Sequence, residues 1–271
     1  MANTVDKVIA IAKAEVGYLE KSKAAYNKSP AILDSKTEGS GRDNYTKYGR
    51  DMHNIYPQVM DFPAAWCDCF VDWCFMKAYG VSNAKALLCG KFDDYTVNSA
   101  GLYKNKGQYF KRGTTLPKVG DQIFFTNGKR ICHTGLVYKV DSTKVYTIEG
   151  NTSGGSTLVP NGGGVAMKSY PHTYGKIDGY GRPKYDNVEV APVVETSSEI
   201  AMPTLKKKSI GTEVKKLQKN LNSVIKAKLA VDGDFGPATE RAVKEFQKKF
   251  LLKIDGIYGP KSYNKMINVL L

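Results

Sequence analysis

One stretch of the sequence decides the fold: residues 63–74, which read PAAWCDCFVDWC. Apolar or thiol side chains recur there at the spacing of a helix that buries one face, at Cys67, Phe70, Val71, Cys74 and Ala78. Asp61 is placed to cap this helix, Pro63 suits its first turn, and Gly80 is expected to end it. Cys67 therefore lies near the helix start, where free N–H groups and the helix dipole favour a thiolate. A reactive nucleophile is placed in this way.

The length of the chain, 271 residues, suits one medium and one small domain, and its 42% hydrophobic and 24% charged residues are typical of a globular protein. Residues 4–15 predict an amphipathic first helix and not a signal peptide. No apolar run approaches the roughly 18 residues that a membrane span needs. We therefore expect a protein made in the cytoplasm, with no membrane span.

The formal net charge of +14 indicates a polyanionic partner, such as nucleic acid, an anionic membrane or the acidic polymers of a cell wall. The sequence shows no arginine-rich arm, zinc finger or aromatic-basic RNA motif, so we expect no nucleic-acid partner. The five cysteines are an odd number in a chain too large to need disulfides. We interpret them as reduced thiols.

Helices come first in the larger predicted domain and strands follow. Residues 20–61, rich in Gly, Ser, Asn and Tyr, are predicted to be a long loop that walls a cleft, with short structure at most, and residues 93–103 a short helix. The apolar period then changes to two, which predicts strands at 116–125, 133–140, 145–151 and 165–170 and a last edge strand within 175–183. This order predicts an α+β domain over residues 1–185.

A second, smaller domain follows a linker. Residues 186–203 are acidic, contain Ser and Pro and show no period, which predicts the linker. Residues 231–237, VDGDFGP, recur 23 positions later as IDGIYGP, and each copy combines an Asp-Gly turn with a Gly-Pro helix start. Helices are predicted at 212–224, 238–250 and 262–270, which makes residues 204–271 a small all-α three-helix domain.

A cysteine nucleophile needs a base to take its proton and a third group to hold that base. Of the three histidines, only His133 begins a predicted strand. The next strand carries Glu149 and Asn151, which are two positions apart and therefore face the same side, so that either could accept a hydrogen bond from the imidazole. A buried helical cysteine is more often structural than reactive, but the order Cys, His, Glu-x-Asn favours a catalytic site.

The register of these two strands tests that hypothesis. Pairing of Val140 with Val145 would place His133 and Glu149 on opposite faces. Pairing of Val140 with Lys144, across a three-residue loop, would place the two side chains on the same face. We expect the second register, or one shifted from it by two.

The remaining thiols are interpreted as structural. Cys69 is one position off the reactive face, Cys74 and Cys89 are typical of core thiols, and Cys132 points to the other face of its strand. A zinc site that combines the histidine with Cys67, Cys69 and Cys74 is disfavoured, because this spacing on one helix directs the ligands apart.

Three motifs together resemble the cysteine, histidine-dependent amidohydrolase/peptidase (CHAP) family of papain-like peptidoglycan hydrolases: WCDCFVDW at 66–73, HTGLV at 133–137 and EGNT at 149–152. The resemblance covers roughly residues 5–185 and implies N-terminal helices packed on an antiparallel sheet. It implies that Cys67 is the nucleophile, that His133 is the base, and that Glu149 and Asn151 orient the imidazole. Weaker candidates, for substrate binding, are Tyr45, Tyr48 and Trp66.

The C-terminal repeat is similar to the three-helix peptidoglycan-binding domain. GTEVKKLQ at 211–218, both Asp-Gly loops and AVKEFQ at 242–247 stand at the expected places. Weaker candidates for wall binding are Asp232, Phe235, Asp255 and Tyr258. The implied partner is bacterial peptidoglycan, and anionic wall polymers are left open as a second one.

The two resemblances together imply a peptidoglycan hydrolase of endolysin type that cleaves an amide or peptide bond of the murein stem peptide or crossbridge through a cysteine thioester. Amidase and endopeptidase activity stay open. We expect synthesis in the host cytoplasm without a signal peptide and action on the cell wall after release. The alternative is a non-catalytic wall-binding protein with an inactive CHAP-like domain.

The resemblance implies no cofactor, although some members of the family bind calcium in an acidic loop ahead of the nucleophile. Carboxylates in that region are Glu38, Asp43, Asp51 and Asp61. They lack the Asp-x-Asp-x-Asp-Gly spacing of a calcium loop, so calcium is left open and its ligands are not assigned.

Overall fold

The computed structural model describes residues 4–187, 204–250 and 252–270 of the chain. Two compact units make up the chain, Met1–Ala191 and Pro192–Leu271, and each is considered by itself. The predicted linker, 186–203, lies almost wholly outside the described residues. The boundaries 1–185 and 204–271 therefore stay predictions.

The first unit begins with helices and ends with strands, as predicted. Its helices are α1 (Thr4–Glu15), α2 (Lys23–Lys28), α3 (Lys47–Ile55), α4 (Cys67–Leu87) and α5 (Thr96–Asn105), with short 3-10 segments η1 (Pro30–Asp34) and η2 (Tyr185–Asn187). The region 20–61 thus holds two short helices and a 3-10 segment within loops. The Thr46 hydroxyl caps α3 by accepting from the Gly49 N–H.

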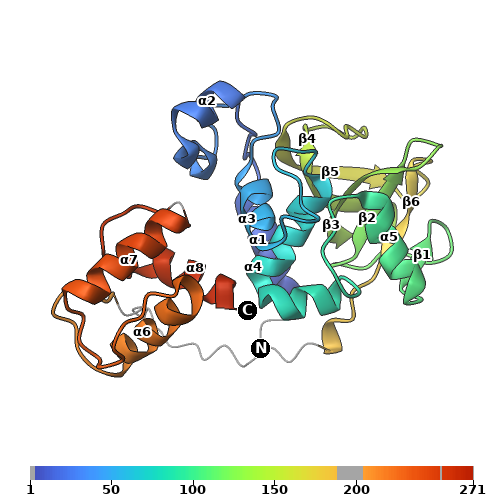
Figure 1. The fold of residues 1–271 in the computed structure, drawn as a ribbon. Helices are drawn as coiled ribbons and strands as arrows, with labels where there is room; N and C mark the ends of the chain where they lie inside the picture. The colour runs from blue at the N-terminus through green and yellow to red at the C-terminus, as the bar shows by residue number, and fades with distance from the viewer. Residues whose placement is uncertain (1–3, 188–203, 251, 271) are drawn as a thin grey trace. The chain divides into compact units, whose positions relative to one another are not determined.

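The strands form one six-stranded sheet in the order β1-β6-β2-β3-β4-β5 (Figure 1). Their bounds are β1 (Tyr109–Lys111), β2 (Gln122–Thr126), β3 (Ile131–Val140), β4 (Lys144–Thr152), β5 (Gly164–Pro171) and β6 (Ile177–Gly181). The prediction of a last edge strand is wrong, because β6 lies between β1 and β2. A Cβ atom at Gly181 would lie 2.3 Å from the Tyr103 ring, so only glycine admits the overlying α5 there.

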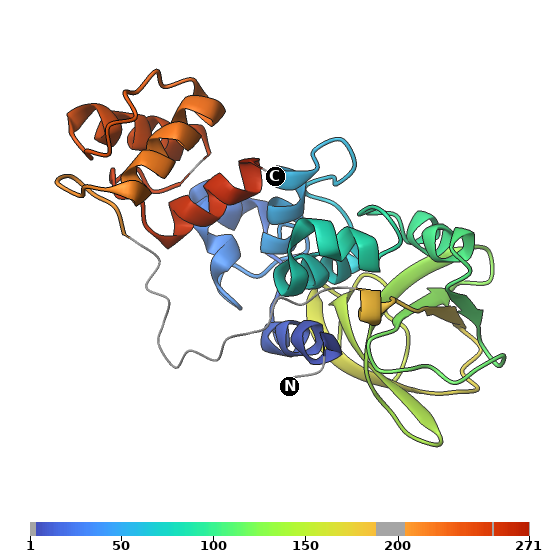
Figure 2. The same ribbon diagram turned by 90° about the horizontal axis from the view of Figure 1, so that it is seen from below.

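Helices α1, α4 and α5 cover one face of the sheet (Figures 1 and 2). Along β2 the side chains alternate: Phe124 enters the core beneath the helices, whereas Ile123 and Phe125 enter a second core on the opposite face. That second core is completed by Tyr170, Tyr180 and their neighbours, with Leu158 and Tyr174 packed against it. Both faces of the central strands are therefore buried.

Helix α4 starts later and is buried more completely than predicted. It begins at Cys67, well past Pro63, and Asp61 is too distant to cap it. Residues 67–76 are buried on every side, and not on one face only. Gly80, with φ 74°, interrupts the helix as predicted, but a second helical segment continues to Leu87.

The turn between β3 and β4 differs from the predicted one. Val140 pairs with Val145, so the predicted pairing of Val140 with Lys144 is wrong. The reason is local, since the Asp141 carboxylate accepts from the Thr143 and Lys144 N–H groups, at 2.9 and 2.8 Å, and builds a wider turn.

A β-bulge then restores the predicted arrangement. The register slips by one residue at Tyr138, and beyond it Leu136 pairs with Ile148. Counting on from that pair, His133 and Glu149 lie on the same face of the sheet. The expected shared face is therefore confirmed. It results from the β-bulge, because the turn by itself would place the two side chains on opposite faces.

The second unit contains α6 (Thr212–Ile225), α7 (Pro237–Lys249) and α8 (Pro260–Leu270), close to the three predicted helices. Its core includes Val214, Leu217, Phe235, Val243, Phe246 and Tyr258. Each Asp-Gly loop is held by a buried glutamine: Gln218 accepts from the Gly233 N–H and Gln247 from the Gly256 N–H, both at 2.9 Å. The sequence repeat is thus also a repeat of hydrogen bonds.

Within the described residues, no helix is both long enough and apolar enough to cross a membrane.

Candidate active site

Cys67 is the first residue of α4, with 6% of its surface exposed. The preceding residue, Trp66, is buried, and its indole N–H donates to the Glu20 carboxylate at 2.8 Å. This bond joins the residue just before α4 to the segment that follows α1. Cys67 is therefore held where the unpaired N–H groups of the first helical turn gather.

His133 and Glu149 form a fully buried pair on neighbouring strands. His133 Nε2 lies 2.9 Å from Glu149 Oε2, and both side chains are inaccessible to solvent. Glu149 also accepts from the Thr147 hydroxyl at 2.5 Å and, more weakly, from the Tyr170 hydroxyl at 3.3 Å. The carboxylate is thereby fixed, and it fixes the plane of the imidazole.

The side chain of Glu149 reaches His133 because the opposing residue is glycine. A Cβ atom at Gly135 would lie 2.5 Å from Glu149 Cγ. Any larger residue at this position of β3 would displace the carboxylate.

The second nitrogen of the ring, His133 Nδ1, is buried and finds no hydrogen-bond partner of good geometry among the described residues. Burial lowers the pKa of His133, but the interactions with the Cys67 thiol and the Glu149 carboxylate outweigh it and raise the pKa to about 9. Because Nε2 is occupied by Glu149, we conclude that the thiol approaches the ring from the Nδ1 side. The raised pKa of His133 favours the protonated imidazole.

Asn151 takes a separate position. It has a left-handed backbone, φ 53°, where the pairing of β4 with β5 shifts between Glu149 and Thr152. Its Oδ1 accepts from the Gly163 N–H at 3.4 Å, and its buried Nδ2 has no partner in the described part of the chain. Glu149, and not Asn151, is therefore the group that accepts from the imidazole of His133.

The other four cysteines are free thiols as well. Burial raises the pKa values of Cys69 and Cys74 well above their usual range, and that of Cys89 to about 11. Cys132 is half-buried; burial raises its pKa, Arg130 lowers it, and the charge of Cys67 raises it. Each of these thiols is thus a poorer thiolate former than an exposed cysteine.

The aromatic residues predicted to bind substrate do not share one environment. Tyr48 is fully buried, and its hydroxyl donates to Glu15 at 2.7 Å, so a role in substrate contact is corrected to a role in the core. Trp66 is likewise a core residue that stacks on Tyr48. Tyr45 is half-buried and stacks on Tyr26 with ring centroids 4.5 Å apart, so it keeps an accessible edge.

The residues predicted to bind the wall in the second unit have structural contacts. Phe235 and Tyr258 are buried in its core. Asp232 accepts from Gln218 at 2.7 Å, and Asp255 accepts from Gln247 at 2.9 Å. Phe235 and Tyr258 are thus core residues, whereas Asp232 and Asp255 are exposed and also shape the repeat loops, because the Asp-Gly turns need an internal acceptor. Wall binding by these residues stays a prediction.

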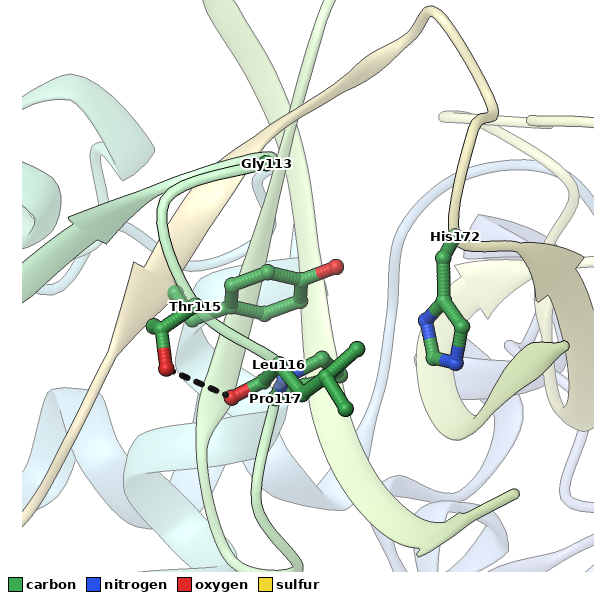
Figure 3. A pocket seen from close by; sticks show the side chains of 6 residues that line it. Gly113, Thr115, Leu116, Pro117 and His172 are labelled. Atoms are coloured by element: carbon green, nitrogen blue, oxygen red, sulfur yellow. Dashed lines mark hydrogen bonds between the residues drawn. The ribbon is translucent and has the colours of Figure 1, made fainter. Parts of the chain in front are cut away.

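Two pockets lie apart from these residues. Figure 3 shows the smaller, of about 230 Å³, between His172, Tyr180 and the loop that contains Gly113, Thr115, Leu116 and Pro117. The other, of about 440 Å³, lies beside Tyr138, Tyr146 and Met167. Neither of these two pockets is lined by Cys67 or His133.

The carboxylates considered for calcium are dispersed. Asp43 accepts from the Lys23 N–H, and Asp51 is bound by Arg50 and by the Trp73 indole. Across the described ranges, no three His, Cys, Asp or Glu side chains gather in a way that could hold a metal ion. The residues present do not fit a calcium loop.

Residues 59–151 match the CHAP domain family, and this range contains all four predicted catalytic residues. The chain contains a CHAP domain. Residues 210–266 match the family described as a putative peptidoglycan-binding domain, which corresponds to the helical second unit. The CHAP domain therefore carries the candidate site, and the C-terminal unit is a separate module.

Individual relatives are similar over short stretches. A zinc D-Ala-D-Ala carboxypeptidase of Streptomyces albus G is 45% identical over 65 residues, 23% of this chain and 26% of the relative. A probable N-acetylmuramoyl-L-alanine amidase of Bacillus licheniformis is 41% identical over 78 residues, 28% of this chain and 22% of the relative. The N-terminal domain of SleB is 32% identical over 24% of this chain and 89% of that chain, with a TM-score of 0.24. The chain thus spans about a quarter of the length of the curated relatives it matches.

Several residues of the site were missed by sequence reasoning. Thr147 could have been found, because it lies two positions before Glu149 and so faces the same side of β4. Tyr170 reaches Glu149 only through the pairing of β5 with β4, which no local pattern indicates. Glu20, the partner of the Trp66 indole, lies far away in sequence and has no signal of its own.

Proposed function

We propose that the chain is a peptidoglycan hydrolase that uses Cys67 as its nucleophile. One observation carries the proposal: the buried His133–Glu149 pair leaves one imidazole nitrogen free on the side of a cysteine at a helix start. The peptidoglycan-binding match in the second unit and the names of the amidase and carboxypeptidase relatives support a cell-wall substrate. The endolysin-type setting and release to the wall stay predictions.

The proposed reaction begins with transfer of the thiol proton of Cys67 to His133. The thiolate attacks the carbonyl carbon of an amide, and the Cys67 backbone N–H at the start of α4 stabilises the oxyanion. His133 then gives its proton to the leaving amine, which leaves a thioester. Water, deprotonated by the same imidazole, hydrolyses the thioester and regenerates the thiol.

The neighbouring residues keep the imidazole in its working state. The carboxylate of Glu149 stabilises the imidazolium formed in the first step and holds the ring through Nε2. Asn151 acts through its backbone, because its left-handed conformation lets the Gly162 N–H bond to its carbonyl at 2.9 Å. That bond closes the glycine-rich loop beside the end of β4.

The bond that is cut is either the muramoyl-alanine amide or a peptide bond of the stem or crossbridge. Mass spectrometry of digested murein distinguishes them, since an amidase releases a new N-terminal alanine and an endopeptidase any other new terminus. Either product is consistent with the proposed thioester chemistry.

Substitution Cys67→Ala tests the proposal. We expect the variant to lose at least about 10³-fold in the rate at which purified walls are cleared, because Cys67 is the thiol that interacts with His133. Turbidity measures the rate, and retention on pelleted walls measures binding, which we expect to be unchanged.

The matched control is Cys132→Ala, which removes a half-buried cysteine next to the base and should clear walls at the wild-type rate. Equal clearing by Cys67→Ala and wild type would refute the nucleophile. Wall binding without clearing by the wild type would favour the non-catalytic alternative.

A further inference from the structure

A buried hydrogen-bonded bridge joins the residue after the nucleophile to the residue after the base. Gln122 Nε2 on β2 donates to Asp68 Oδ1 at 2.9 Å and to Thr134 Oγ1 at 3.2 Å. All three side chains are almost fully buried. Cys67 and His133 are therefore connected through their immediate neighbours by polar contacts that cross from α4 to the sheet.

Both ends of the bridge are anchored. The Ser99 hydroxyl of α5 donates to Asp68 Oδ2 at 2.5 Å, and the Thr134 hydroxyl donates to the Ile123 carbonyl at 2.8 Å. The Asp68 carboxylate is thus held by two other elements, α5 and β2. A helix held at its first turn in this way has little freedom to slide along the sheet.

The bridge is not what stability alone would favour. Burial raises the pKa of Asp68 to about 7, although the bonds from Ser99 and Gln122 lower it; the charges of Asp93 and Asp94 raise it further. The carbonyl oxygen of Gln122 is buried and has no partner among the residues that the structure describes. Apolar side chains in this space would avoid the free-energy cost of the buried carboxylate and of the unpartnered amide oxygen. The bridge is therefore better explained by the positions of the residues that it joins.

Asp72 provides an internal comparison. It lies one helical turn after Asp68 on α4 and is equally buried, but it accepts from the backbone N–H of Asp93 at 3.0 Å. It therefore ties α4 to the segment before α5 and has no bond to β2 or β3. Loss of Asp72 tests the cost of losing a buried carboxylate without breaking the bridge.

We propose that Asp68 and Gln122 are positioning residues that hold the Cys67 thiol at its working distance from His133. The proposal rests on the proposed function for its catalytic meaning, but its geometry is measurable without substrate. Because Cys67 contributes to the charge state of His133, a looser bridge changes the titration of the imidazole.

The experiment is an NMR titration of the histidine rings in the full chain, which has only three histidines. The wild-type His133 ring should titrate near pH 9, and Cys67→Ala gives the lower value that remains when the thiol is absent. We expect Asp68→Ala to shift His133 towards the Cys67→Ala value and to slow wall clearing by roughly 10- to 100-fold. Asp68→Asn keeps an acceptor for Gln122 and should restore both, and Asp72→Ala should titrate as wild type.

Gln122→Leu removes the bridge from the side of the sheet, and it tests the positioning role if Asp68→Ala does not fold. The proposal is overturned if Asp68→Ala or Gln122→Leu, while folded, titrates like wild type, or if Asp72→Ala shifts His133 equally. A wild type that fails to clear walls but shows these shifts would refute the proposed function and leave the positioning role intact.

Discussion

The two units differ in how completely their buried polar side chains are hydrogen-bonded. In the second unit, Gln218 donates to Asp232, to the Asp234 carbonyl and to Thr239, and its oxygen accepts from Gly233. In the first unit, six buried side-chain polar atoms lack a partner among the described residues, among them atoms of His133, Asn151 and Gln122, and no such atom is found in the described part of the second unit.

This difference distinguishes a purely structural polar cluster from the polar groups of a functional site. A buried polar group costs free energy unless it is hydrogen-bonded, so a purely structural cluster tends to be complete. Three of the six incomplete groups of the first unit belong to the candidate site or to the bridge, namely those of His133, Asn151 and Gln122. We interpret them as groups whose partners are supplied by the reaction or whose placement serves it.

The strongest test of this comparison is at Glu149, where we expect the largest loss of activity. Glu149→Gln removes the charge that stabilises the imidazolium, and we expect wall clearing to slow by about 10²- to 10⁴-fold. Since Glu149 raises the pKa of His133, the wild-type rate should fall as the pH rises through about 9. This alkaline limb of the pH–rate profile should lie at lower pH in the variant. The pH dependence of clearing measures both effects.

The control is Thr147→Val, which keeps the Glu149 charge and removes one bond to it. This variant should keep the limb near its wild-type position. An unchanged alkaline limb in Glu149→Gln would mean that the pair is structural, like the polar clusters of the second unit.

Much of the fold followed from local pattern. The three C-terminal helices and the strands β3 to β5 have a strong period and recognisable ends, and each lies within a few residues of its predicted range. The helix that carries Cys67 was predicted as well, although it continues past Gly80 to Leu87. The inner position of β6 and the short β1 could not be predicted in this way. They depend on which strands meet across the sheet, and the tight contacts at Gly179 and Gly181 reflect that choice.

The candidate site was predictable in its residues but not in its details. The order of Cys67, His133 and Glu149 identified the group, whereas the Tyr138 bulge that aligns two of them leaves no trace in the hydrophobic pattern. Four of the five aromatic residues predicted to bind are buried, because an aromatic side chain suits a core and a surface equally: Tyr48, Trp66, Phe235 and Tyr258. Burial, which separates the cases, depends on the assembled structure.

A smaller effect is expected where the polar cluster is complete. Gln218→Ala removes every bond that this side chain makes and leaves the Gly233 N–H without its acceptor, which should destabilise the second unit by about 1 to 3 kcal/mol. Gln247→Ala removes the equivalent set and should cost about the same. Calorimetry of the full chain measures the loss, and tryptophan fluorescence serves as the control because both tryptophans, Trp66 and Trp73, lie in the first unit.

The smallest effect tests how closely the two loops are equivalent. Ser262 accepts from Gln247 at 3.1 Å in the place where Thr239 accepts from Gln218 at 3.2 Å. Ser262→Thr should therefore keep every hydrogen bond and add one methyl group, with a change in unfolding free energy within about 0.5 kcal/mol. A larger loss in calorimetry would show that the second loop is packed more tightly around its hydroxyl than the first, and that the repeat is equivalent in its bonds but not in its volume.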